Sequence, residues 1–239
     1  MSAFESLLVS RMADGRPEVF SSVQGEGASM GVPSTFLRLG VCNLQCSWCD
    51  TAYTWDWRKY DRAQQVMSLT VDEALTAVEA FGNRNVVITG GEPLIQRRQL
   101  LPLVAKLKAA GHRIEIETNG TIAPGELAAV VDQFNVSPKL SGSGNEGLRR
   151  TLPLVLREFA SHPGTYFKFV VSDPYDVDDA AAVAQLAGAA AERVILMPEG
   201  RSPEELAARN SWVVEACIAR GWRFSTRLHV LLWGDKRGV

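Results

Sequence analysis

The sequence predicts one α/β domain built on a parallel sheet with crossover helices, and three observations lead to this fold class. About six apolar segments of strand length alternate with helical segments after residue 33. The chain has 239 residues, of which 46% are apolar, and no linker divides it. Polar motifs directly follow the predicted strands, as in parallel folds whose carboxyl-end loops carry the chemistry. We therefore treat residues 1–239 as a single domain.

The elements follow from local pattern. Apolar segments predict strands at 34–40, 85–93, 112–120, 133–140, 165–172, 192–200 and 222–234. Helical periodicity or composition predicts helices at 70–81, 97–111, 176–191 and 202–221. Thr70 and Glu73 suit an N-terminal capping box, and Gly111 suits a helix C-terminus. The Gly/Ser-rich segment 141–150 predicts a mobile excursion.

Composition narrows the function classes. The formal net charge of −2 and the pI of about 6.0 argue against a broad basic surface for nucleic acid. No run approaches the roughly 18 apolar residues of a membrane span. The first segment, "MSAFESLLVSRMADGRPE", lacks the features of a signal peptide. We expect a cytoplasmic protein without nucleic-acid or membrane partners, in which clustered thiols bind metal rather than form disulfides.

The segment "CNLQCSWCDT" (42–51) places Cys42, Cys46 and Cys49 within eight positions. A structural zinc site would need a fourth ligand, and the one other cysteine, Cys217, lies in an apolar helical pattern. An iron–sulfur cluster is the alternative. Three thiolates can hold a four-iron cluster and leave one iron open for the amino and carboxylate groups of a small molecule.

This C-x3-C-x2-C spacing resembles the signature of the radical S-adenosylmethionine (radical SAM) superfamily, and Trp48 matches its usual aromatic. The resemblance implies a partial (β/α)6 TIM-like barrel with a [4Fe-4S] cluster that cleaves S-adenosylmethionine reductively. The loops "TGGEP" (89–93), "SPK" (137–139) and "MPEG" (197–200) also resemble the superfamily's cofactor loops. The cofactor contacts so implied are Trp48, Cys49, Asp50, Gly91, Glu92, Ser137, Pro138, Lys139, Met197, Pro198, Glu199 and Gly200.

Each of these loops also has an ordinary interpretation. "TGGEP" can be a plain strand-to-helix turn, Lys139 a surface lysine, and "MPEG" a helix-capping turn. Glycine lets the backbone approach a ligand closely, which favours Gly91 as a contact to the methionyl amino group.

A narrower resemblance covers "VFSSVQGEGASMGVPSTFLRLGVCNLQCSWCDT" (19–51), with "ETNG", "SPK" and the C-terminal "LHVLLWG". The segment resembles the 7-carboxy-7-deazaguanine synthases of queuosine-type deazapurine biosynthesis. These carbon–nitrogen lyases convert 6-carboxy-5,6,7,8-tetrahydropterin to 7-carboxy-7-deazaguanine with loss of ammonia. The resemblance also implies a homodimer and an electron donor such as flavodoxin or ferredoxin.

That substrate suggests partners in this chain. We expect the pterin to contact Val23, Gln24, Gly25, Glu26, Arg38, Thr89, Glu117 and His229. Carboxylates such as Glu26 can accept from the amino and ring N–H groups of a pterin edge. Arg38 lies inside an apolar strand, where a buried cation needs a partner, either the substrate carboxylate or a structural salt bridge. The "QGEG" turn could instead be a polar hairpin, and His229 a structural histidine.

The residue after the cluster loop suggests a second metal. The family binds magnesium at a threonine or serine in the position of Thr51, and Mg²⁺ prefers oxygen ligands with several waters or substrate oxygens. A turn role for Thr51 is the alternative.

Two other functions stay open on sequence grounds: a glycyl-radical activating enzyme and a non-enzymatic structural metal-binding module.

Overall fold

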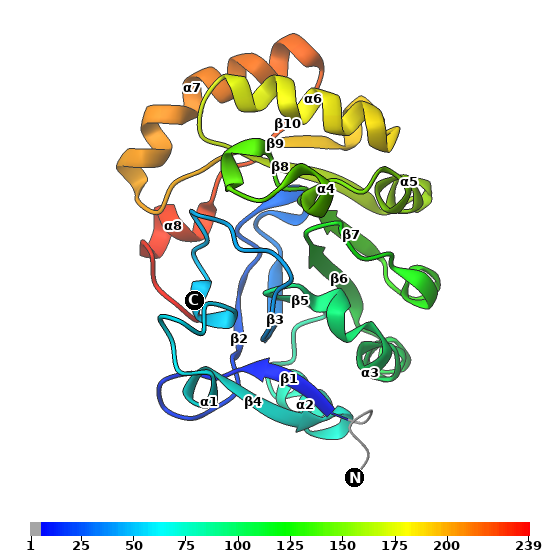
Figure 1. Ribbon diagram of the computed structural model, residues 1–239. Helices are drawn as coiled ribbons and strands as arrows, with labels where there is room; N and C mark the ends of the chain where they lie inside the picture. Colours follow the sequence, from blue (N-terminus) through cyan, green and yellow to red (C-terminus); the bar gives the residue numbers. More distant parts are fainter. Residues whose placement is uncertain (1–5) are drawn as a thin grey trace.

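The computed structural model describes residues 6–239, and residues 1–5 of the predicted domain lie outside it. One curved sheet organises the described chain, in the order β10-β9-β8-β7-β6-β5-β3-β1-β4, with β2 paired to β3. From β3 through β5 to β10 neighbouring strands are parallel, whereas β1, β2 and β4 pair antiparallel. The sheet does not close, so the fold is the partial barrel expected from the resemblance (Figure 1).

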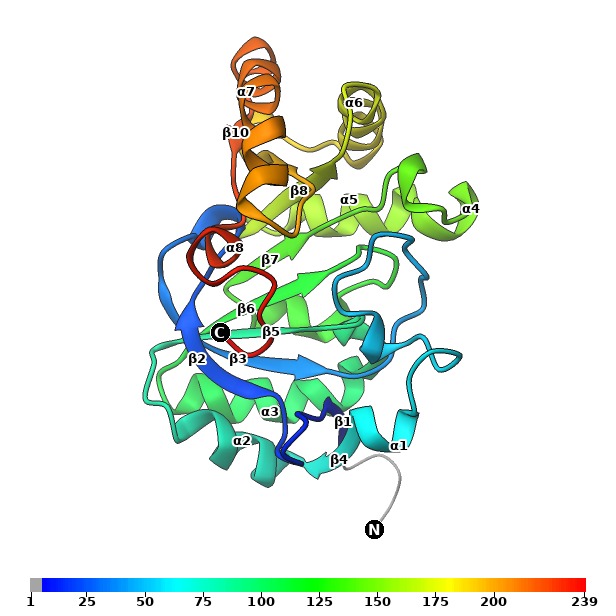
Figure 2. The same cartoon turned by 90° about the vertical axis from the view of Figure 1, so that its left-hand side faces the viewer.

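The strands are β1 (Ser6–Ser10), β2 (Val19–Val23), β3 (Pro33–Leu39), β4 (Val66–Thr70), β5 (Asn85–Gly90), β6 (Arg113–Thr118), β7 (Gln133–Val136), β8 (Thr165–Val171), β9 (Val194–Pro198) and β10 (Arg223–Phe224). The α-helices are α1 (Arg62–Gln65), α2 (Val71–Glu79), α3 (Arg97–Ala109), α4 (Gly147–Arg150), α5 (Pro153–Ser161), α6 (Tyr175–Ala187), α7 (Pro203–Arg220) and α8 (Leu228–Trp233). Helices α3, α5, α6 and α7 lie along the convex side of the sheet, while α8 and the C-terminal segment lie at its open side (Figures 1 and 2).

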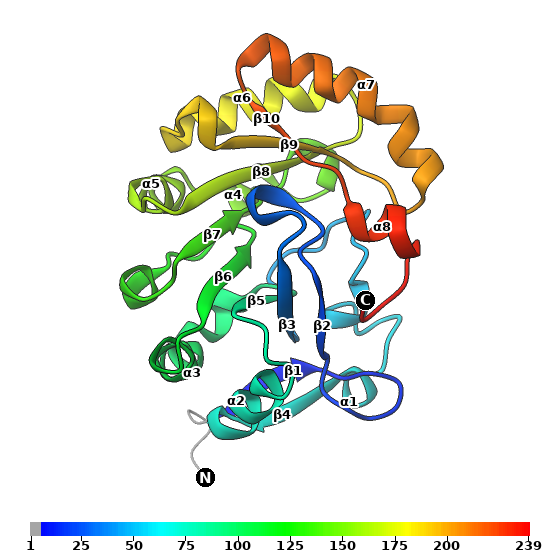
Figure 3. The same cartoon turned by 180° about the vertical axis from the view of Figure 1, so that it is seen from behind.

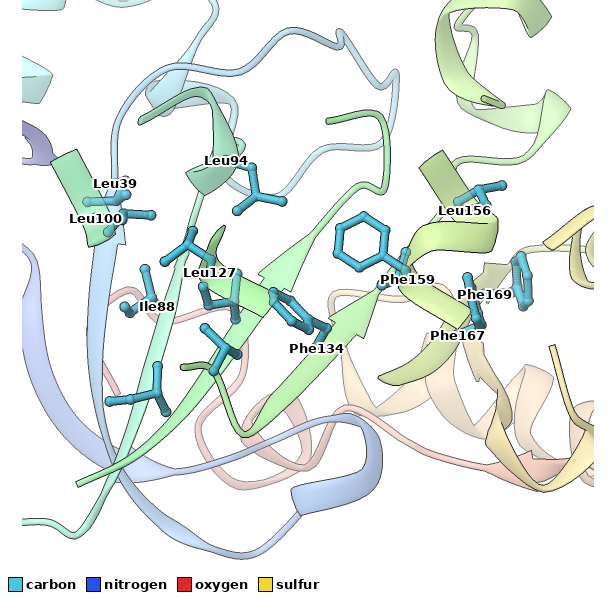
Figure 4. Close-up of a cluster of buried hydrophobic side chains, with 14 of the residues drawn as sticks. Leu39, Ile88, Leu94, Leu100, Leu127, Phe134, Leu156, Phe159, Phe167 and Phe169 are labelled. Atoms are coloured by element: carbon cyan, nitrogen blue, oxygen red, sulfur yellow. The ribbon is translucent and has the colours of Figure 1, made fainter. Parts of the chain in front are cut away.

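The main core fills the space between the sheet and the outer helices. Ile88, Phe134 and Phe167 from the strands are fully or almost fully buried, as are Leu100 and Phe159 from the helices (Figure 4). Burying one such side chain stabilises the fold by about 1.5–3 kcal/mol, so this layer holds the strands in register. The concave side of the sheet, by contrast, carries polar and charged residues.

Local signals in the sequence are confirmed at several helix ends. The Thr70 hydroxyl accepts the Glu73 N–H at 3.2 Å, and the Glu73 carboxylate accepts the Thr70 N–H at 2.7 Å, which completes the expected capping box. Gly111 follows α3 with a φ of 87°, the left-handed conformation that glycine adopts without strain. Each predicted strand from 34–40 to 192–200 is present, with ends shifted by a few residues.

The C-terminal prediction is wrong in one respect. Segment 222–234 contains only the two-residue strand β10 and then the helix α8, where we expected one strand. A short apolar run has no period that separates strand from helix. In the structure Val230 is buried while Leu232 and Trp233 are largely exposed, so one helical face packs and the other meets solvent. His229 therefore lies on a helix.

The Gly/Ser-rich segment 141–150, expected as a mobile excursion, contains regular structure, and its mobility stays a prediction. It contains a short 3-10 turn at Ser141–Ser143 and the helix α4. Its backbone and side chains contact the cysteine loop, for example through the Ser47 N–H, which donates to the Ser143 carbonyl at 3.0 Å. In residues 6–239, no helix is both long enough and apolar enough to cross a membrane.

Candidate active site

The cysteine loop begins at the carboxyl end of β3. Val41, just before Cys42, has a φ of 76°, a left-handed backbone conformation that costs about 1–3 kcal/mol for such a residue. Two hydrogen bonds hold it there: its N–H donates to the Thr54 carbonyl at 2.8 Å, and its carbonyl accepts the Glu92 N–H at 2.9 Å. The sheet therefore fixes the direction in which the loop leaves the strand.

The three clustered thiols face one cavity. Asn145 donates to Cys46 Sγ at 3.3 Å, and the Trp55 indole N–H donates to Cys49 Sγ at 3.3 Å. Burial raises the pKa of the Cys42 thiol to about 12 and also raises the pKa of the Cys46 thiol, so both favour the protonated form in the absence of a metal. Metal binding must displace those protons.

The fourth cysteine is elsewhere. Cys217 lies on α7, outside the cavity, and its Sγ donates to the Arg223 carbonyl at 3.3 Å. Within residues 6–239, no three His, Cys, Asp or Glu side chains converge as ligands of a single ion. A zinc site made of the four cysteines is therefore not assembled. A cluster takes one thiolate per iron, so three separated thiols around one cavity fit it.

The cavity lies on the concave side of the sheet and brings together most of the predicted site residues. From the cofactor set, it is lined by Trp48, Cys49, Asp50, Gly91, Ser137, Lys139, Met197 and Glu199. From the substrate set, it is lined by Val23, Gln24, Gly25, Glu26, Arg38, Thr89, Glu117 and His229. Cys42, Cys46 and Thr51 also line it, whereas Glu92, Pro138, Pro198 and Gly200 do not.

The Gly-Gly loop after β5 is shaped by backbone contact with β3. A Cβ on Gly90 would lie 2.2 Å from the Leu39 carbonyl oxygen, and a Cβ on Gly91 would lie 2.1 Å from the Val41 carbonyl oxygen. No other residue fits at either position. The Gly91 N–H donates to the Leu39 carbonyl at 3.1 Å, which holds the loop against β3.

Glu92 differs from its expected role as a direct cofactor contact. Its carboxylate is fully buried and accepts from the Leu94 N–H, the Thr118 hydroxyl and the Asn119 N–H at 2.6–3.0 Å. Burial raises the pKa of this carboxyl group. Because protein donors occupy both oxygens, Glu92 links the ends of β5 and β6 and does not face the cavity.

The ammonium group of Lys139 can still bind an anion. Its Nζ donates to the Ser137 hydroxyl at 3.0 Å and lies 5.5 Å from the centre of the Trp48 ring. Among the described residues, no carboxylate lies within salt-bridge distance of this ammonium group. Lys139 is therefore not a plain surface lysine, and it can receive a ligand carboxylate beside the cysteine loop.

The "QGEG" turn reaches the cavity from the opposite end of the sheet. Val23 lies opposite Pro33, the first residue of β3, whereas the cysteine loop follows the last. The Gln24 amide donates to Glu115 at 2.9 Å and to Glu117 at 3.2 Å. The Gln24 amide nitrogen is thus engaged within the protein, while Gln24 still lines the cavity, so its expected contact with the pterin stays a prediction.

Glu117 presents a fixed carboxylate to the cavity. The Thr89 hydroxyl donates to its second oxygen at 2.8 Å, and Lys168 Nζ lies 3.9 Å from the first. These contacts aim the carboxylate while leaving it partly exposed in the cavity. Thr89 therefore positions Glu117 as well as facing the cavity itself.

Glu26 is surrounded by cations. Lys168 donates to one oxygen, and Arg227 Nε donates to the other at 3.0 Å. Burial opposes ionisation, but the two cations outweigh it and hold the pKa of Glu26 below its usual range. His229 lies 3.9 Å from the same carboxylate and packs on Gly25, where a Cβ would come within 2.2 Å of its ring.

Arg38 combines the two roles that the sequence left open. Its Nε donates to the fully buried Glu18 at 2.8 Å, so it is part of a salt bridge, and it also lines the cavity. Glu18 binds Arg237 as well, at 2.6 and 3.0 Å, and accepts the Tyr53 hydroxyl at 3.1 Å. Two guanidinium groups share one carboxylate, which leaves a net positive charge at the cavity wall.

Thr51 lies between the cluster loop and this wall. Its hydroxyl is 3.6 Å from Cys49 Sγ, and its carbonyl accepts the Thr54 hydroxyl at 2.8 Å. It therefore has a turn role through its backbone, while its hydroxyl faces the cavity and can add an oxygen ligand.

Sequence reasoning missed several polar residues that line the cavity, among them Asn135, Lys168 and Arg227. Lys168 lies within the apolar strand β8, which is the same signal that drew attention to Arg38. Asn135 likewise interrupts the apolar strand β7. Arg227 lies in a loop after β10, and no local pattern distinguishes it from a surface arginine.

Comparisons with known proteins agree with this site. The radical SAM superfamily model matches residues 38–150. A 7-carboxy-7-deazaguanine synthase from Pyrobaculum aerophilum is 41% identical over 225 residues, covering 92% of this chain and 95% of that protein. One from Rhodopirellula baltica is 35% identical over 234 residues, covering 93% and 87%. The crystal structure of QueE from Escherichia coli has a TM-score of 0.69 and 27% identity, covering 94% of this chain and 95% of that chain.

These matches confirm both resemblances seen in the sequence. The superfamily implies a [4Fe-4S] cluster and S-adenosylmethionine as cofactors, and the loop of three free thiols beside Lys139 fits that pair. The matches to the Pyrobaculum aerophilum and Rhodopirellula baltica proteins cover 92% and 93% of this chain and are therefore not confined to the cysteine loop. The chain belongs to the 7-carboxy-7-deazaguanine synthase family.

Proposed function

We propose that this protein is a carbon–nitrogen lyase that converts 6-carboxy-5,6,7,8-tetrahydropterin to 7-carboxy-7-deazaguanine and ammonia. The observation that carries the proposal is the division of one cavity into two ends. The three thiols and Lys139 lie at the carboxyl ends of the strands, while Glu117 and the "QGEG" turn lie deeper on the concave side. A cofactor and a small heterocycle can therefore meet in one cavity.

At the cofactor end, Cys42, Cys46 and Cys49 would hold the cluster. Lys139 and Ser137 would receive the carboxylate and nucleoside region of S-adenosylmethionine, and the Gly91 carbonyl would accept from its amino group. Together the bound cluster and S-adenosylmethionine supply the one-electron chemistry that starts the rearrangement.

At the substrate end, the protein would orient the pterin and balance its charge. The Glu117 carboxylate, aimed by Thr89, accepts from the amino and ring N–H groups of the heterocycle. Arg38 receives the substrate carboxylate, because the two arginines around Glu18 leave one positive charge unmatched. Binding both ends of the substrate in this way holds its reacting carbon in one place.

We further propose that Mg²⁺ binds at the Thr51 hydroxyl and uses substrate oxygens and water as its other ligands. A hard cation with few protein ligands is typical of magnesium sites. The ion would act as a template and reduce the negative charge of the substrate carboxylate during rearrangement.

The assembly and partners are also proposals. A reductant such as flavodoxin or ferredoxin would supply the electron, and two copies of the chain would form a homodimer. We place the reaction in the cytoplasm, because free thiols and a low-potential cluster require a reducing compartment.

An anaerobic assay tests the function directly. The reconstituted protein, S-adenosylmethionine, a reductant and the carboxy-tetrahydropterin should yield ammonia and 7-carboxy-7-deazaguanine, identified by mass spectrometry. Cys46→Ala serves as the control that lacks a cluster ligand. Binding of the pterin without any 7-deazapurine product from the loaded wild type would refute the proposed reaction.

A further inference from the structure

Arg227 joins three segments that come from different parts of the chain. Its Nε donates to Glu26 at 3.0 Å, its Nη1 donates to the Gly200 carbonyl at 2.8 Å, and its Nη2 donates to Asp50. The side chain is 11% exposed. Each nitrogen of one planar guanidinium therefore serves a different loop.

The three segments belong to opposite ends of the cavity. Glu26 lies in the turn at the substrate end, Asp50 lies between Cys49 and Thr51 in the cluster loop, and Gly200 follows β9. We propose that Arg227 is a positioning residue that couples binding at the cluster end of the cavity to binding at the substrate end. This inference rests on the proposed function, because it takes the two ligands from it.

Hydrogen bonds next to Arg227 connect the same two segments across the open side of the barrel. The Leu228 N–H donates to the Gly25 carbonyl at 2.8 Å, and the Gly27 N–H donates to the Ser225 hydroxyl at 2.8 Å. No strand pairing links β10 to β2 in the described sheet, so these contacts join the segment after β10 to the turn after β2, the strand that pairs with β3. Figure 3 shows α8 at this open side, seen from behind.

The two carboxylates depend on Arg227 to different degrees. Glu26 keeps Lys168 as a second cation, whereas Asp50 has no other salt bridge or side-chain hydrogen bond among the described residues. Removing Arg227 would thus release the cluster loop first, and the substrate turn to a lesser degree.

Coupling between two sites is a ratio of affinities, and that ratio is the decisive measurement. We expect the pterin to bind the oxidised, cluster-loaded wild type at least about fivefold more tightly when S-adenosylmethionine is present. No turnover takes place without a reductant, so calorimetry reports binding alone. In Arg227→Gln the ratio should fall to about one, whatever happens to each separate affinity. Arg227→Lys should restore it only in part, because an ammonium group cannot bind three loops in a fixed fork.

Arg237→Gln is the matched control. Arg237 is also a partly buried arginine with several contacts, but it binds Glu18, Gln65 and Ser10 and does not touch Asp50. This variant should change stability and substrate affinity while keeping the wild-type ratio. An unchanged ratio in Arg227→Gln, or an equal loss in Arg237→Gln, would overturn the inference.

A second readout does not need the pterin. Hydrogen exchange of the cluster-loaded protein should become at least about fivefold faster at 42–51 in Arg227→Gln, with a smaller change at 24–27 and no such change in Arg237→Gln. If the wild type fails to bind the pterin, the proposed function fails, and the exchange pattern still decides whether Arg227 holds the cluster loop. Wild-type exchange at 42–51 in Arg227→Gln would refute the positioning role.

Discussion

Replacing Arg38 with alanine separates a substrate contact from a structural salt bridge. Arg38 donates to a carboxylate that is fully buried, yet its own side chain is 18% exposed and lines the cavity. If its guanidinium receives the substrate carboxylate, truncation removes one partner of a charged pair. That loss costs about 2–5 kcal/mol. At tenfold per roughly 1.4 kcal/mol, KM should rise about 30-fold to 4,000-fold.

The effect on stability should be smaller, and the structure gives the reason. Glu18 keeps Arg237 at 2.6 and 3.0 Å and the Tyr53 hydroxyl at 3.1 Å after Arg38 is removed. Its buried charge therefore remains compensated. The lost charge-assisted hydrogen bond contributes about 1.5–3 kcal/mol to the free energy of unfolding.

Anaerobic steady-state kinetics and denaturant unfolding of the same preparation provide the two measurements. Tyr53→Phe is the control, because it removes one hydrogen bond to Glu18 and no charge from the cavity. It should lower stability by about 1 kcal/mol with KM unchanged. A loss of stability in Arg38→Ala with KM near the wild-type value would show that Arg38 is structural only.

Three further predictions follow from the same geometry. Cys46→Ala should lose the cluster absorbance and turnover, whereas Cys217→Ala should keep both and cost only ~1 kcal/mol of stability; the reverse pattern would overturn the ligand assignment. Thr51→Ala should weaken the stimulation of turnover by magnesium more strongly than it weakens S-adenosylmethionine binding. Identical magnesium titrations of the variant and the wild type would contradict this. Burial lowers the pKa of His162, whose Nδ1 accepts the Gly164 N–H. Because the unfolded chain then binds a proton more readily than the folded chain, the free energy of unfolding should decline as pH falls below about 6.5. Urea unfolding of His162→Gln should show a weaker decline over this pH range, and the same pH dependence as the wild type would count against the prediction.

The sequence alone determined the fold class and the chemistry of the cofactor end. Apolar strands predict buried positions because only such segments fill the layer between the sheet and the outer helices. Thiol spacing predicts the cluster because its ligands lie on one short loop, where sequence distance limits spatial distance. Capping at Thr70 was readable for the same reason, since its partner Glu73 is three residues away.

Other features depend on residues that meet only after folding. Arg227 contacts Asp50, which is 177 residues away, and Arg237 contacts Glu18, which is 219 residues away, so no local pattern marks either. The orientation of Glu92 away from the cavity likewise depends on donors from β6 and the residue after it.

The C-terminal segment shows the same division. Its apolar run was visible, but whether it becomes strand or helix depends on the gap between β10 and β2 that it must bridge. The sequence determined which side chains carry cofactor chemistry, because spacing on a short loop and burial of apolar strands are local properties. Only the tertiary structure decided which charges compensate one another in the cavity, because an ion pair between distant segments forms only where the folded chain brings the two side chains together.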